Sequence, residues 1–169
     1  DAIYTAISMV DLTTLEGMDT PGKVRQLCGK AINPVPPEIQ DQMMKYDKFR
    51  PIPKVGAICV YPDMVPYAAE ALAGSGINIA SVATAFPAGR LPLDLKVLDV
   101  KRAVKFGATE IDMVIDRGAF HCGKYQQVFD EIVAVKDACG DAHLKVIIET
   151  GELKTYDKIR LASWLSMEA

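Results

Sequence analysis

The sequence lacks the short motifs that mark nucleotide-binding and phosphate-binding loops. No G-x-G-x-x-G follows the first strand-like segment, and the chain contains no G-x-x-x-x-G-K-[ST]. The four cysteines form no C-x-x-C pair and no metal-ligand spacing, and the two histidines are far apart. We therefore expect neither a metal nor a cofactor. Three of the cysteines lie in apolar helix or strand patterns, which predicts buried free thiols.

Neither sign of charge is in large excess, because the formal net charge is −3 over 169 residues. Such a balance gives no basic surface for nucleic acid or for an anionic membrane. The sequence has no signal-peptide pattern and no apolar run of membrane-spanning length, so the cytoplasm is the expected location. A phosphorylated small molecule stays open as a partner, because a local nest of donors is enough to bind it.

What the sequence does contain is a series of five short apolar segments that alternate with helical patterns. The predicted strands cover residues 8–15, 55–62, 78–84, 111–115 and 144–150. Thr20 and Pro21 mark the start of the first helix, and Gly107 and Gly140 mark the ends of two later ones. A proline-rich connection over residues 33–53 includes a possible short helix near residues 38–46. This alternation predicts a parallel α/β fold.

Polar residues gather where the predicted strands end. They are Asp11, Thr13, Thr14, Cys59, Tyr61, Thr84, Asp112, Asp116, Glu149 and Thr150. The carboxyl ends of parallel strands are where α/β proteins build their sites, in closed barrels and in open sheets alike.

Two oppositely charged residues lie among apolar neighbours in adjacent predicted strands, Asp112 in the fourth and Lys145 in the fifth. A carboxylate among apolar neighbours is costly unless it is paired or hydrogen-bonded, and Lys145 is a candidate partner. Such a pair suits proton transfer or amine chemistry, and it equally suits a structural ion pair inside a sheet. Glu149, further along the fifth strand, either orders the surroundings of Lys145 or satisfies backbone donors.

The number of strands leaves two architectures open. An open doubly wound sheet of five strands fits the chain length, whereas a complete (β/α)8 barrel needs about 250 residues. The last helical pattern, residues 156–169, stops without a C-cap signal. We therefore predict a TIM (β/α)8 barrel of which about the first five βα units are present. Residues 1–169 would then form a single domain that is truncated before its sixth strand.

Five motifs lie in order along nearly the whole chain: MVDLTTL (9–15), AICVYP (57–62), SVATAFPAG (81–89), GATEIDMVI (107–115) and LKVIIETGEL (144–153). Together they resemble the deoxyribose-phosphate aldolase family. The resemblance implies a class I aldolase on a TIM barrel. Such an enzyme cleaves 2-deoxyribose 5-phosphate reversibly to glyceraldehyde 3-phosphate and acetaldehyde through a lysine Schiff base, in deoxyribonucleotide catabolism. It also implies a phosphorylated sugar as substrate and a homo-oligomer, either a dimer or a tetramer.

The resemblance assigns roles to individual residues. Asp112 matches the catalytic aspartate, which relays protons through a water, and Lys145 matches a lysine that tunes this aspartate. Asp11 and Thr13 match residues near the sugar end of the pocket. Cys59 matches a pocket cysteine that is not essential, and Thr84 is a further candidate pocket residue.

The chain departs from the family pattern in two places. The family's Schiff-base lysine lies on the sixth strand, which the 169 residues do not include, so we expect the fragment alone to be inactive. The second departure is Ala85, where the family commonly has glycine or asparagine. The alternative hypothesis is a binding or regulatory module on an open five-stranded sheet. In that case Asp11, Asp112 and Asp116 would loosely resemble the acidic cluster of a receiver domain.

Overall fold

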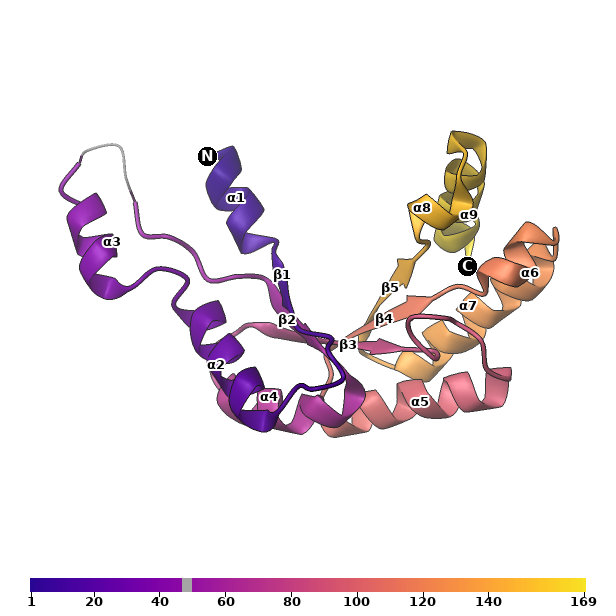
Figure 1. Cartoon of the computed structure of the whole chain (residues 1–169), viewed down its shortest axis with the longest axis horizontal. Helices are drawn as coiled ribbons and strands as arrows, with labels where there is room; N and C mark the ends of the chain where they lie inside the picture. The colour runs from indigo at the N-terminus through magenta and orange to yellow at the C-terminus, as the bar shows by residue number, and fades with distance from the viewer. Residues whose placement is uncertain (47–49) are drawn as a thin grey trace. The chain divides into compact units, whose positions relative to one another are not determined.

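The computed structural model describes residues 1–46 and 50–169, and Figure 1 follows its elements along the chain. Five strands alternate with helices: β1 (Asp11–Thr13), β2 (Ala57–Val60), β3 (Asn78–Ala83), β4 (Glu110–Val114) and β5 (His143–Ile147). Their order in the sheet is β1-β2-β3-β4-β5, and β1 pairs in parallel with β2 as β4 does with β5. This arrangement agrees with the predicted parallel α/β fold. The chain divides into two compact units, Asp1–Ala80 and Ser81–Ala169.

In the first unit, the described residues 1–46 and 50–80 form four α-helices and one 3-10 helix besides the strands. They are α1 (Ala2–Ser8), α2 (Pro21–Ile32), α3 (Pro37–Met43), η1 (Pro62–Met64) and α4 (Val65–Ala71). The predicted start of α2 is confirmed, because the Thr20 hydroxyl accepts a hydrogen bond from the Lys23 amide and Pro21 occupies the first turn. Helix α2 buries Val24 and Cys28 and packs against α4 and β2.

The second unit contains α5 (Leu93–Phe106), α6 (Arg117–His121), α7 (Tyr125–Cys139), α8 (Thr150–Leu153) and α9 (Tyr156–Glu168). Helix α5 ends at Gly107, as predicted, with a left-handed φ of 111°. Helices α5 and α7 pack against each other, as Figure 1 shows. Within the described parts of the chain, none of the helices is long and apolar enough to cross a membrane.

Several predicted boundaries differ from the structure. The first strand was expected over residues 8–15, but Ser8 ends helix α1, where its hydroxyl donates to the Thr5 carbonyl, and the strand is limited to Asp11–Thr13. The short helix expected near residues 38–46 is α3, which begins one residue earlier and ends at Met43. Part of the proline-rich connection, residues 47–49, lies outside the described residues. Helices α6 and α8 were not predicted, because each is too short for apolar periodicity to reveal it.

The loop that follows β3 begins with two residues in the left-handed region, Thr84 and Ala85, each with a φ of 62°. Ala85 is the position at which the sequence departs from the expected glycine or asparagine. Those two residues adopt a positive φ more readily than alanine, whose Cβ lies too close to the backbone there. The backbone of the loop therefore keeps a glycine-like conformation although the residue is alanine.

Replacing Ala85 by glycine should relieve this strain and raise the free energy of unfolding by about 1 kcal/mol. The measurement is urea denaturation followed by the fluorescence of Trp164, which lies in the same unit. The matched control is Ala83→Gly in β3, where glycine should lower stability by a similar amount, about 1 kcal/mol. A loss of stability in both variants would contradict the conclusion that the positive φ of Ala85 strains the backbone.

Candidate active site

Strands β4 and β5 place a carboxylate and an amine side by side. Asp112 and Lys145 are direct partners in the parallel register of the two strands. The Lys145 Nζ donates to Asp112 Oδ1 at 3.1 Å and to Oδ2 at 3.2 Å. The pairing that the sequence suggested is therefore confirmed, and it follows from the register alone, because register partners on one face lie within side-chain reach.

The two members of this pair differ in their access to water. Asp112 is only 6% exposed, whereas the side chain of Lys145 is 42% exposed. The Lys145 ammonium also lies 3.9 Å from Glu110 Oε2, two residues before Asp112 on the same strand. Two carboxylates therefore lie beside one ammonium. The expected role of Lys145, in which it supports Asp112, stays a prediction.

Thr84 fixes the end of β3 to the end of β4. Its buried hydroxyl donates to the Val114 carbonyl at 3.1 Å and accepts from the Val114 amide at 2.9 Å. Val114 lies two residues after Asp112, on the same face of the strand. The Thr84 hydroxyl is therefore engaged with the backbone of β4, and its contact with a substrate stays a prediction.

Glu149 lies outside β5 and has a positive φ of 53°. Its carboxylate forms an ion pair with Arg117, the first residue of α6. Glu149 therefore does not extend the strand, and although it is the N-cap residue of α8, its side chain makes no capping hydrogen bond to a backbone donor. The side chain instead connects the segments that follow β4 and β5.

The remaining predicted pocket residues belong to the first unit. Asp11 and Thr13 are the first and last residues of β1, and the Thr13 hydroxyl donates to the Asp11 carbonyl at 3.0 Å. Cys59 is buried in β2 as the register partner of Thr13. The Thr14 amide continues the pairing with the Cys59 carbonyl at 3.1 Å. Their contact with a substrate stays a prediction.

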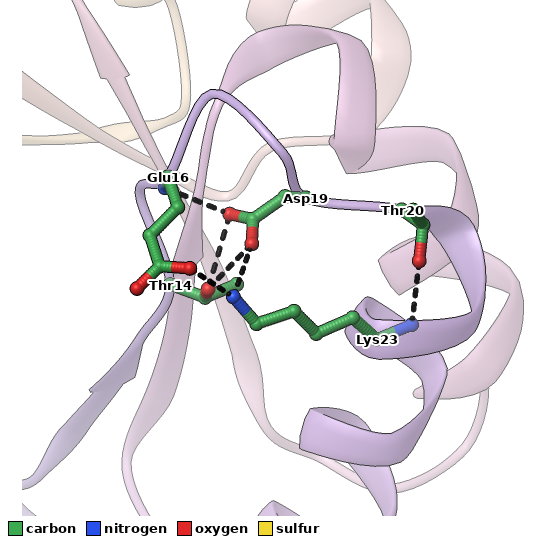
Figure 2. Close-up of polar contacts among 5 residues, drawn as sticks. All are labelled: Thr14, Glu16, Asp19, Thr20 and Lys23. Carbon is green, nitrogen blue, oxygen red and sulfur yellow. Dashed lines mark hydrogen bonds and ion pairs between the residues drawn. The ribbon is translucent and has the colours of Figure 1, made fainter.

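The segment between β1 and α2 is held by an ion-pair cluster that Figure 2 shows. The Thr14 hydroxyl donates to the Asp19 carboxylate at 2.9 and 3.0 Å, and the Glu16 amide donates to it at 3.0 Å. Lys23, from the first turn of α2, reaches Asp19 at 2.6 Å and Glu16 at 2.7 Å. The hydrogen bond from Lys23 is the main reason why the pKa of Asp19 lies below its usual value, and the same contact raises the pKa of Lys23.

The thiols agree with the prediction of buried free cysteines at three positions, Cys28, Cys59 and Cys139, while Cys122 is exposed. Burial raises the pKa of Cys28 and of Cys139. Their reactive thiolate forms are therefore scarce at neutral pH. These two thiols contribute packing rather than nucleophilic chemistry.

Three charged groups were not among the predicted site residues. Lys96 of α5 and Glu131 of α7 form a buried ion pair at 2.7 Å, and Arg117 joins Glu149. A signal for the first pair was present, because Lys96 and Glu131 each lie at helical spacing within an apolar face and carry opposite charges. Arg117 follows a strand end without a recognisable pattern, so contacts between loops were needed to find it.

The chain is similar in sequence to proteins of a known family. A family model described as "DeoC/LacD family aldolase" matches residues 5–169. A human deoxyribose-phosphate aldolase is 42% identical over 169 residues, which make up 99% of this chain and 52% of that protein. The chain spans about half the length of the curated relatives that it matches.

Solved structures agree on the fold. A crystal structure from Coccidioides immitis, described as a candidate deoxyribose-phosphate aldolase, matches with a TM-score of 0.79 and 31% identity. The match covers 97% of this chain and 56% of that one. A tetrameric deoxyribose phosphate aldolase from Aeropyrum pernix matches with a TM-score of 0.66 and 24% identity, over 96% of this chain and 61% of that one. The predicted fold class is thereby confirmed as a partial TIM-barrel-like α/β fold.

The stabilising contribution of the Asp19 cluster should depend on pH. Because the folded-state pKa of Asp19 is lowered, its stabilising contribution is complete above the usual aspartate range and disappears as the pH falls through the lowered pKa. An NMR titration of the Asp19 carboxyl carbon should show a raised midpoint in the Lys23→Met variant. Lys30→Met, at the other end of α2, should leave the midpoint unchanged. An equal midpoint in Lys23→Met and the wild type would exclude Lys23 as the cause.

Proposed function

The chain belongs to the DeoC/LacD aldolase family, and on that premise we propose that the whole protein is a deoxyribose-phosphate aldolase. It would cleave 2-deoxyribose 5-phosphate to glyceraldehyde 3-phosphate and acetaldehyde. The observation that carries the proposal is the Asp112–Lys145 pair on adjacent strands, in which a nearly buried carboxylate faces a solvent-accessible ammonium. The names of the relatives supply the substrate.

The proposed chemistry proceeds through a Schiff base on a lysine. An amine attacks the sugar carbonyl, and the resulting carbinolamine loses water to give the iminium ion. Deprotonation of the C3 hydroxyl then breaks the C2–C3 bond. Its electrons move into an enamine, and glyceraldehyde 3-phosphate departs. Protonation of the enamine carbon and hydrolysis release acetaldehyde and regenerate the amine.

Within this scheme Asp112 accepts and returns protons, and Lys145 orients the carboxylate through its two hydrogen bonds. The Schiff-base lysine would come from a part of the protein outside these 169 residues, because Lys145 is engaged by carboxylates. Asp11, Thr13 and Cys59 would line the sugar pocket, and Thr84 would hold the strand ends that surround it. No metal or cofactor is needed, since the iminium ion is the electron sink.

The proposal extends to assembly and location. We propose that both units belong to one barrel domain in the whole protein, as they correspond to about half of the length of its relatives. A homo-oligomer, dimer or tetramer, is proposed by analogy with the tetrameric Aeropyrum pernix enzyme. A cytoplasmic location is supported by the free buried cysteines, which suit a reducing compartment.

Replacing Asp112 by asparagine in the full-length protein should lower kcat by about 10²–10⁴-fold, the usual contribution of a general acid–base group. The assay measures glyceraldehyde 3-phosphate release from 2-deoxyribose 5-phosphate, with circular dichroism as the folding check. Asp141→Asn, at an exposed position before β5, is the matched control and should keep wild-type turnover. Near-normal turnover of Asp112→Asn would make Asp112 a structural residue.

The 169-residue chain alone should form no Schiff base, because Lys145 is paired with two carboxylates and the proposed Schiff-base lysine lies outside these residues. Incubation with acetaldehyde and borohydride, followed by intact mass measurement, should show no added ethyl group. The full-length protein should gain one under the same conditions. A stable adduct on the short chain that maps to Lys145 would make Lys145 the nucleophile and refute the assignment above.

A further inference from the structure

We propose that Arg117 is a positioning residue of the aldolase site, an inference that rests on the proposed function. Its guanidinium connects the segments that leave β3, β4 and β5. In doing so it holds together the segments that follow the strands carrying Asp112 and Lys145. Arg117 itself lies beyond β4 and would not touch the reacting atoms.

The contacts of Arg117 are specific. Its Nη1 and Nη2 atoms each donate to the Pro87 carbonyl at 3.1 Å, in the segment after β3. Nη1 also forms the ion pair with Glu149, in the segment after β5. The side chain of Arg117 is 19% exposed, so most of it is covered by protein. A planar guanidinium can satisfy a carbonyl and a carboxylate together, and an ammonium on a lysine stem cannot reproduce that fork.

The segment after β3 already lies against β4 at two other points. Thr84 bonds both backbone groups of Val114. At Gly89, with a φ of 69°, an added Cβ would lie 2.7 Å from the Ile115 carbonyl oxygen, so the two backbones are nearly in contact. The Arg117 contact with Pro87 falls between these points, and the bond to Glu149 extends the connection to the segment after β5.

The connection matters because of where the proposed chemistry takes place. Asp112 and Lys145 are the third residues of the five-residue strands β4 and β5, and Glu149 lies four residues after Lys145. Glu149 has a left-handed backbone, which an L-residue adopts only when its surroundings hold it there. Loss of the ion pair would release that segment and let the carboxylate and the ammonium shift. A shift of about 1 Å in a catalytic group can lower turnover by about 100-fold.

The test uses the full-length protein with three variants: Arg117→Met, Arg117→Lys and Glu149→Gln. Turnover is expressed per active site, and the sites are counted by borohydride trapping with acetaldehyde. Arg117→Met should lower kcat per trapped site by about 10–100-fold with a smaller change in KM. Arg117→Lys should recover only part of the loss. Combining Arg117→Met with Glu149→Gln should add little beyond the larger single effect.

Arg102→Met, at an exposed arginine of α5, is the matched control and should retain wild-type turnover. Counting trapped sites separates positioning from folding, because a merely structural arginine would reduce the number of sites and leave turnover per site unchanged. Full turnover per trapped site in Arg117→Met would therefore overturn the inference. Complete recovery of turnover in Arg117→Lys would overturn it as well. An inactive wild type would refute the proposed function and this role together, whereas an active wild type with an insensitive Arg117→Met refutes this role alone.

Discussion

The parallel pairing of β4 with β5 is the constraint on which the candidate site depends. It places Asp112 opposite Lys145, so the cost of removing a carboxylate from water is offset by an ammonium at 3.1–3.2 Å. A shift of one residue in this register would turn Lys145 to the other face of the sheet and leave Asp112 without this partner. The chemistry of the site is therefore set by backbone hydrogen bonding, before any loop contributes.

Two lysines of the second unit, Lys96 and Lys145, pair with carboxylates and differ in their exposure. Lys96 is 1% exposed and lies between two helices with Glu131. Lys145 keeps much of its surface open to water, and its carboxylate partner lies beside that opening. The buried pair of Lys96 and Glu131 can hold two helices together but has no access to a ligand. The partly exposed pair of Lys145 and Asp112 can hold two strands together and can also be reached by a ligand.

The alternation of strands and helices, the start of α2, the ends of α5 and α7 and the Asp112–Lys145 pair were all predictable from the sequence, because each follows from local periodicity, capping or strand pairing. The ion pair between Glu149 and Arg117 was not predictable from the sequence. The backbone of Glu149 leaves the extended region two residues after β5, and side-chain alternation then no longer tells which way a residue points. Helix α1 was not predicted, and only its last residue, Ser8, was assigned to the first strand, because Ala2–Ser8 is short and its residues are at least partly exposed. Contacts between loops and short helices arise from tertiary packing, and no period in the sequence encodes them.

The buried pair of Lys96 and Glu131 also restricts how the sequence can diverge. Removing one charge leaves the other uncompensated, at a cost of about 3–5 kcal/mol, yet replacing both with apolar residues of similar volume is often neutral or favourable. Substitution of only one of the two residues is therefore destabilising, whereas substitution of both together need not be. Descendants of this protein should either inherit both residues or lose both, so positions 96 and 131 should change as a unit over evolutionary time.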